Sequence, residues 1–217
     1  RASDSGVVAK DQLEEARKTA INEGFYRQEW ECDFLEGAGQ LFRGVREVMI
    51  ATPQKPEDQH LYVMGVDLAK VSDYTVIAVY DRKTNAQVYQ DRFNKIEWPF
   101  QKAKIREIAS HYNNALVMLD ATGIGDPIAD DLLRSGVAVE PIKFTEATKK
   151  ELIEKLSIWI QQQKIKMLPI EESKFEFDNF SYTVGDTGRI RYEAPQGYND
   201  DIVIAHALAV WSLQPII

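Results

Sequence analysis

Two apolar runs, each ending at or next to an aspartate, constrain most strongly what this chain folds into. One covers residues 62–69, YVMGVDLA, and the other covers residues 115–121, ALVMLDA. Runs of this length and composition are typical of strands buried in a sheet. A carboxylate on a buried strand is costly unless something binds it. Asp67 and Asp120 are therefore candidate site residues.

A third acidic group, Asp200 and Asp201, opens the apolar helical run 202–213. Two strand carboxylates and one from a late helix can converge on divalent metal, which indicates a metal-dependent nuclease. Two ions roughly 3.5–4 Å apart would offset the carboxylate repulsion and clamp the attacking and leaving oxygens of a phosphodiester. With one cysteine and three scattered histidines, the ligands would be oxygens, which favours Mg²⁺ or Mn²⁺.

Each acid also has a structural explanation that needs no ligand. Asp67 could end its strand in a turn, and Asp120 could cap the loop 121–125. Asp200 or Asp201 could serve as the N-cap of the last helix, where a negative charge is favourable. His206, on the same helix, is interpreted as a packed or exposed histidine rather than a general base.

The composition is that of a globular chain of one large domain, or one domain with an appendage. Of 217 residues, 44% are hydrophobic and 28% are charged, and no apolar run reaches the ~18 residues of a membrane span. The single Cys32 excludes an internal disulfide and favours an intracellular setting. The net charge of −8 disfavours a large basic nucleic-acid surface. The start at Arg1 instead of Met indicates an excised fragment.

The order of expected elements predicts an α/β fold with a mixed central sheet. Strands are expected at about 61–68, 74–81, 86–93, 115–120, 137–142 and 165–168, with a hairpin at about 180–193. Helices are expected at 10–22, 98–112, 126–135, 148–163, 174–180 and 200–213. An antiparallel meander followed by parallel strands would place helices on both faces of the sheet. We expect residues 1–58 to form an N-terminal helix and linker segment packing on the core of a main domain, 59–217.

Basic residues that could contact phosphate occur in two places. Lys143, Lys149 and Lys150 lie near a helix start, and Arg189 and Arg191 project from the same side of a hairpin strand. The alternative is that each is ordinary surface charge. These five residues are our candidates for DNA binding.

Four motifs and one upstream segment together resemble the nuclease domain of phage large terminases. They are GVDLA at 65–69, DYTV at 73–76, LDATG at 119–123, NDD at 199–201 and the aromatic segment 25–34. The resemblance implies a ribonuclease H-like fold, with Asp67, Asp120 and Asp201 as metal-binding acids and Asp200 as a further ligand.

The resemblance also implies a function and partners. It implies Mg²⁺- or Mn²⁺-dependent endonucleolytic cutting of double-stranded, concatemeric DNA during capsid filling in the host cell cytoplasm. The implied partners are the DNA, the portal protein, the small terminase subunit and the ATPase domain of the same full-length protein. No GxxxxGK[ST] motif is present, so we expect no ATPase activity in this chain.

Three alternatives remain open at this point. Another ribonuclease H-like nuclease, such as a junction resolvase or transposase core, would use the same metal chemistry on a different DNA structure. An actin-like phosphotransferase opens with a similar strand but needs a second, duplicated half. A catalytically inactive module that docks on the portal would not need its acids.

Overall fold

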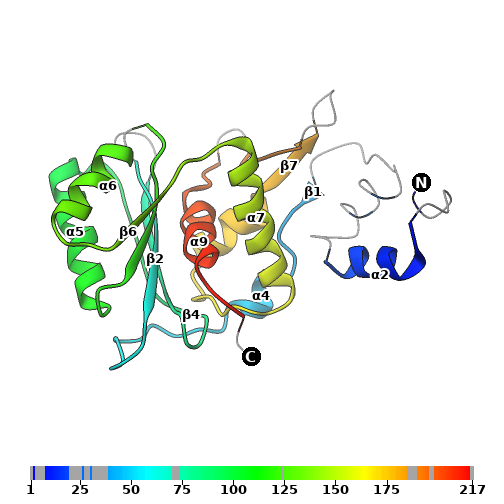
Figure 1. Cartoon of the computed structure of the whole chain (residues 1–217), viewed down its shortest axis with the longest axis horizontal. Coiled ribbons are helices and arrows are strands. Elements are labelled where there is room, and N and C mark those ends of the chain that lie inside the picture. The colour runs from blue at the N-terminus through cyan, green and yellow to red at the C-terminus, as the bar shows by residue number, and fades with distance from the viewer. Residues whose placement is uncertain are drawn as a thin grey trace.

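Five strands form the central sheet of the molecule, in the order β4-β3-β2-β5-β6 (Figure 1). β2 (Tyr62–Asp67), β3 (Thr75–Asp81) and β4 (Ala86–Phe93) make an antiparallel meander. β5 (Leu116–Asp120) and β6 (Val139–Ile142) follow in parallel with β2. The expected mixed sheet is confirmed, with β2 at its centre.

The computed structural model describes residues 2, 8–19, 26, 30, 39–69, 74–123, 125–184, 190–195 and 198–215. Within these residues, no helix has the length and apolar character needed to cross a membrane.

Side chains alternate between the two faces of the sheet, because successive residues of a strand point in opposite directions. On one face the sheet packs against α5 (Trp98–His111) and α6 (Gly125–Arg134), seen together at one side of Figure 1. The core on this face includes Met64, Val66, Ile77, Val79, Ile105, Leu119, Ile128 and Leu132. The crossover helices therefore cover one whole side of the sheet.

The opposite face is covered by α9 (Asp201–Trp211), which is buried on all sides from Asp201 to Val210. Beyond α9 lie α7 (Glu146–Gln161), α8 (Glu171–Asn179) and the short α4 (Val45–Val48) (Figure 1). A helix that is apolar all round needs such double cover. The core on this face includes Leu41, Phe42, Val63, Tyr80, Met118, Leu156, Ile160, Phe177, Phe180 and Leu208.

A second sheet lies beyond the α7 and α8 layer. It joins β1 (Gly39–Gln40), β7 (Ser181–Val184) and β8 (Ile190–Glu193) in that order, all antiparallel. β7 and β8 are the predicted hairpin. α2 (Lys10–Thr19) lies at the end of the molecule remote from α5 and α6 (Figure 1). The division of the chain at residue 58 stays a prediction.

The predicted strand at 165–168 is wrong. Only Lys166 forms a bridge, to Ala86. Its neighbour Met167 instead exchanges backbone hydrogen bonds with Val48 and Ala51. The segment thus lies between two partners and pairs with each for only a residue or two, which is too short for a ladder.

Candidate functional site

Asp67 and Asp120 end two adjacent parallel strands at the same edge of the sheet. Val66 pairs with Leu119, so the two aspartates are next in register, on strands about 4.8 Å apart. Val66 and Leu119 both belong to the core under α5 and α6. Since direction alternates along a strand, Asp67 and Asp120 both face the side that α9 covers.

Asp201 reaches this edge because α9 packs directly on β2. A Cβ atom on Gly65 would overlap the carbonyl oxygen of Ala205 and lie 2.6 Å from the amide nitrogen of Ala209. Only glycine allows this approach of helix to strand. Asp201, the first residue of α9, is 7% exposed, and its Oδ2 accepts a hydrogen bond of 3.3 Å from the backbone N–H of Tyr74.

Three other acids lie close enough to Asp67 to change the pKa of its carboxyl group. Burial raises the pKa of the Asp67 carboxyl well above its usual range, and the negative charges of Asp201, Asp200 and Asp120 raise it further. The ammonium group of Lys149 acts in the opposite direction. The carboxylates are thus close enough to disfavour each other's ionisation, which a bound cation would reverse.

Asp120 and Asp200 each use one carboxylate oxygen in a contact within the protein. Asp120 Oδ1 accepts a hydrogen bond of 2.8 Å from the N–H of Thr122, the loop-capping role considered above. Asp200, the N-cap residue of α9, makes no capping hydrogen bond from its side chain and instead pairs with Lys149 at 3.2 Å. The chain after Asp120 also requires glycine at position 125, because a Cβ there would overlap the carbonyl oxygen of Asp120.

Within the described part of the chain, no three His, Cys, Asp or Glu side chains already converge as a metal-binding group. Charges change each other's pKa over longer distances than the length of a metal–oxygen bond, about 2.0–2.6 Å. The acids can therefore raise the pKa of Asp67 without their oxygens already meeting at one point. The donor set consists of carboxylates, which fits Mg²⁺ or Mn²⁺ in chemistry.

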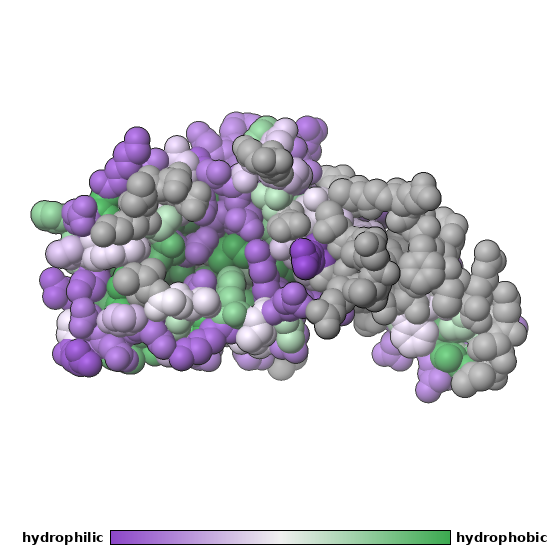
Figure 2. Space-filling view, turned by 90° about the horizontal axis from the view of Figure 1, so that it is seen from above, coloured by the Kyte–Doolittle hydropathy of each residue, from purple (hydrophilic) through white to green (hydrophobic). Residues whose placement is uncertain are grey.

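Figure 2 shows the surface of the molecule seen from above the view of Figure 1. Hydrophilic residues cover most of the coloured surface, with smaller hydrophobic areas between them (Figure 2).

Residues 64–212 match the family model described as the terminase RNase H-like domain. The chain belongs to this family. This chain is 29% identical over 204 residues to the terminase large subunit of Thermus virus P23-45, a match that covers 89% of this chain and 42% of that relative. It thus spans less than half the length of that protein.

Solved structures show the same fold. The large terminase nuclease from thermophilic phage G20c, crystallised with bound magnesium, superposes with a TM-score of 0.74 at 27% identity, covering 80% of this chain and 97% of that one. Structures of the G20c nuclease with bound cobalt and zinc also match. The nuclease domain of the Thermus phage P74-26 large terminase gives a TM-score of 0.73 at 26% identity, covering 81% and 96% of the two chains. The ribonuclease H-like fold of the terminase domain is thereby confirmed.

The basic residues predicted to bind DNA are found mostly in ion pairs. Lys143 pairs with Asp126 at 2.8 Å, and Lys149 pairs with Asp200 as described. Lys150 pairs with Glu154 at 3.6 Å. Arg191 is exposed on β8, whereas Arg189 lies outside the described residues. Their role in the terminase domain stays a prediction.

Sequence reasoning missed two charged residues beside Asp201. Arg92 on β4 and Glu176 on α8 form an ion pair of 3.1 Å. Burial raises the pKa of Glu176 to about 7, although hydrogen bonding from the Ile202 N–H and the charge of Arg92 lower it. An acid in a helical pattern is usually solvated, so nothing in the sequence indicated that Glu176 is buried.

Proposed function

We propose that this chain is the divalent-metal-dependent endonuclease of a phage packaging motor, cutting double-stranded concatemeric DNA by two-metal-ion phosphodiester hydrolysis. Asp67, Asp120 and Asp201 would be its metal ligands, with Asp200 as a fourth. The observation that carries the proposal is the in-register placement of Asp67 and Asp120 on the face where Asp201 begins α9. The elevated pKa of Asp67 supports it, because the group is affected by all three other acids.

Mg²⁺ or Mn²⁺ would be the physiological ion. The related G20c nuclease was crystallised with magnesium, cobalt and zinc, which supports a divalent-cation site in this family. When bound, two ions would activate the attacking water and stabilise the departing 3′ oxygen.

The fold would fix the backbone positions of the three acids that hold the ions. The strand ends hold Asp67 and Asp120 rigidly, and the buried α9 holds Asp201. Lys149 is paired with Asp200 and would be released when a cation takes over the charge of that carboxylate. The loop-capping contact of Asp120 uses only Oδ1, which leaves Oδ2 for coordination.

Binding partners follow from the family. We propose that the chain works with double-stranded DNA, the portal protein, the small terminase subunit and the ATPase domain of the full-length terminase, in the host cytoplasm. With its net charge of −8, we expect the chain to bind DNA weakly on its own, so the other parts of the motor would hold the substrate.

The test is plasmid cutting in Mn²⁺ by wild type and by the variants Asp67→Asn, Asp120→Asn and Asp201→Asn. Each variant should lose roughly a hundredfold or more of the cutting rate, because each removes a charged ligand. Asp130→Asn, on the exposed side of α6, is the matched control and should cut like wild type. Cutting by Asp67→Asn at the wild-type rate, with folding verified by circular dichroism, would rule the proposal out.

A further inference from the structure

A ring of contacts closes around Asp201 and includes two residues that have no part in the proposed function so far. The backbone N–H of Tyr74 donates to Asp201 Oδ2 at 3.3 Å. The guanidinium carbon of Arg92 lies 3.7 Å from the centre of the Tyr74 ring. Arg92 Nη2 donates to Glu176 Oε1 at 3.1 Å, and Glu176 Oε2 accepts from the N–H of Ile202 at 2.9 Å.

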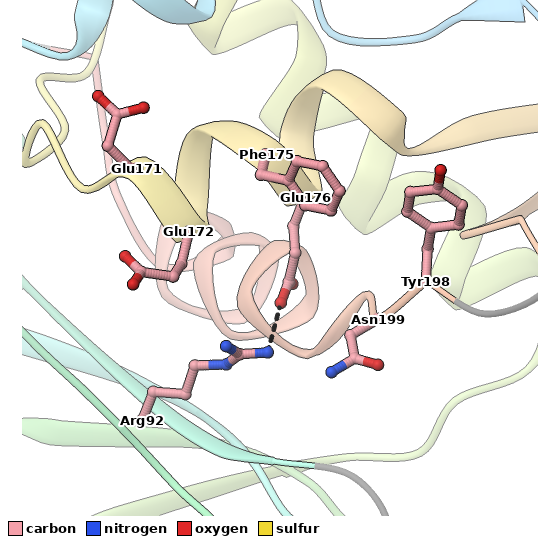
Figure 3. Close-up of a pocket in the computed structure, with 7 residues that line it drawn as sticks. All are labelled: Arg92, Glu171, Glu172, Phe175, Glu176, Tyr198 and Asn199. Atoms are coloured by element: carbon pink, nitrogen blue, oxygen red, sulfur yellow. Dashed lines mark hydrogen bonds and ion pairs between the residues drawn. The ribbon is translucent and has the colours of Figure 1, made fainter.

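The ring holds Asp201 from two sides. Ile202 follows Asp201 in the chain, so the bond to Glu176 fixes the backbone at the first turn of α9. Tyr74 fixes the carboxylate itself. Arg92 joins the two sides, because its planar guanidinium can stack on an aromatic ring while its edge donates to a carboxylate. Figure 3 shows the Arg92 side chain reaching toward the carboxylate of Glu176, which lies on α8.

Direct contact of Arg92 with DNA is the competing explanation. Arg92 borders a cavity of about 510 Å³ that is also lined by three carboxylates, Glu171, Glu172 and Glu176 (Figure 3). A phosphate would be repelled there. The Nε atom of Arg92 is buried, and the side chain as a whole is only 26% exposed. The geometry favours a role within the protein.

We propose that Arg92 and Glu176 are positioning residues, which hold Asp201 in place for metal binding through Tyr74 and Ile202. The proposal rests on the proposed function insofar as Asp201 is a metal ligand. The ring itself can be tested without metal or DNA.

The first measurement is amide hydrogen exchange by NMR on the metal-free protein. In Arg92→Met, the amides of Tyr74 and Ile202 should both exchange about tenfold faster than in wild type, because both hydrogen bonds lose their shared support. Lys104→Met is the matched control. Lys104 Nζ pairs with Oδ2 of Asp91, the residue before Arg92, at 2.7 Å, and it lies 4.7 Å from the centre of the Phe93 side-chain ring. Lys104 nevertheless takes no part in the ring of contacts around Asp201.

The second measurement is Mn²⁺ binding by calorimetry, where the sign of the change separates the explanations. Removing a positive charge beside an acidic site should by itself tighten cation binding. If Arg92 positions Asp201, Arg92→Met should instead weaken Mn²⁺ binding about tenfold, as loss of a residue supporting a ligand does. Arg92→Lys keeps the charge without the flat stacking surface and should recover part of the affinity.

Each outcome decides one question. Unchanged exchange at Tyr74 and Ile202 in Arg92→Met, or Mn²⁺ binding equal to or tighter than wild type, overturns the positioning role. Absence of Mn²⁺ binding in wild type contradicts the proposed function, and the exchange rates still decide the role of the ring. If Arg92→Met does not fold, the same exchange measurement on Arg92→Lys takes its place, with faster exchange at both amides expected.

Discussion

His206 is fully buried in the middle of α9 and has neutral partners. Its Nδ1 lies 2.7 Å from the hydroxyl of Tyr80, and its Nε2 lies 3.1 Å from Oε1 of Gln90. Burial lowers the pKa of His206 to about 3. The interpretation of this residue as a packed histidine agrees with the structure, and a general-base role is disfavoured because no solvent reaches it.

The buried histidine should make the protein sensitive to acid. Its folded-state pKa lies below the unfolded value of 6.5, so the unfolded state binds the extra proton as pH falls below 6.5. The free energy of unfolding should therefore decrease by about 1.4 kcal/mol per pH unit. Between pH 7 and pH 5, wild type should lose about 2 kcal/mol more than His206→Gln.

Urea unfolding of both proteins at several pH values checks this expectation. Glu176 also titrates in this range, but it is present in both proteins and its contribution cancels in the difference. Parallel pH profiles for wild type and His206→Gln would show that His206 is not held neutral in the folded state.

At the scale of elements, the contact between α9 and β2 determines where Asp201 lies. Gly65→Ala should destabilise the protein by about 3 kcal/mol or more, because the new Cβ meets the helix backbone, which cannot move like a flexible side chain. Gly123→Ala is the control. Gly123 has a φ of 61° but nothing near its Cβ position, so only a backbone cost of about 1 kcal/mol is expected.

Thermal unfolding measures both changes, and Mn²⁺ binding shows whether the site is affected. An unfolding free energy of Gly65→Ala within 1 kcal/mol of wild type would mean that α9 can move away from β2 at little cost. Asp201 would then be less rigidly placed than the packing indicates.

The sheet could be predicted from sequence because its pattern is local. The meander turns at Asn85, whose φ of 51° suits asparagine, and β4 has the expected bounds of 86–93. The sequence predicts that α7 begins at Thr148, which is two residues too late. The helix begins at Glu146 because Thr145 and Thr148 form a reciprocal cap, and a Thr in place of the usual Glu or Gln is hard to recognise.

The residues of the candidate site also fall into those that the sequence indicates and those that it does not. Two apolar runs that each lead to an aspartate indicate Asp67 and Asp120 at the ends of buried strands, and Asp201 is recognisable as a charge before an apolar helix. Arg92 and Glu176 could not be found, because their contacts join β4 to α8 and exist only after the chain has folded. Tertiary packing, which no local pattern encodes, buries Glu176.

For the whole molecule, metal binding should increase stability. Mn²⁺ at a hundred times its dissociation constant should add about 2.7 kcal/mol to the free energy of unfolding, or roughly 5–10 °C in Tm. Metal-free Asp67→Asn should be more stable than metal-free wild type, because it lacks one of the repelling charges, and Mn²⁺ should stabilise it far less.

Differential scanning fluorimetry with and without Mn²⁺, each with a chelator control, measures these shifts. Sodium chloride at matched ionic strength separates specific binding from screening. Equal Tm increases in wild type and Asp67→Asn would place the bound metal elsewhere on the protein.

The acids come from distant parts of the chain, and one of them is carried by α9, which follows all five strands of the central sheet in the sequence. A ribosome making this protein therefore completes the sheet before it has produced the helix that fills its open face. Until that helix has been synthesised and has docked, the aspartates of β2 and β5 lack their third member. The cluster of acids proposed to hold metal is therefore complete only after a segment about 80 residues beyond Asp120 has been synthesised and has docked on the sheet.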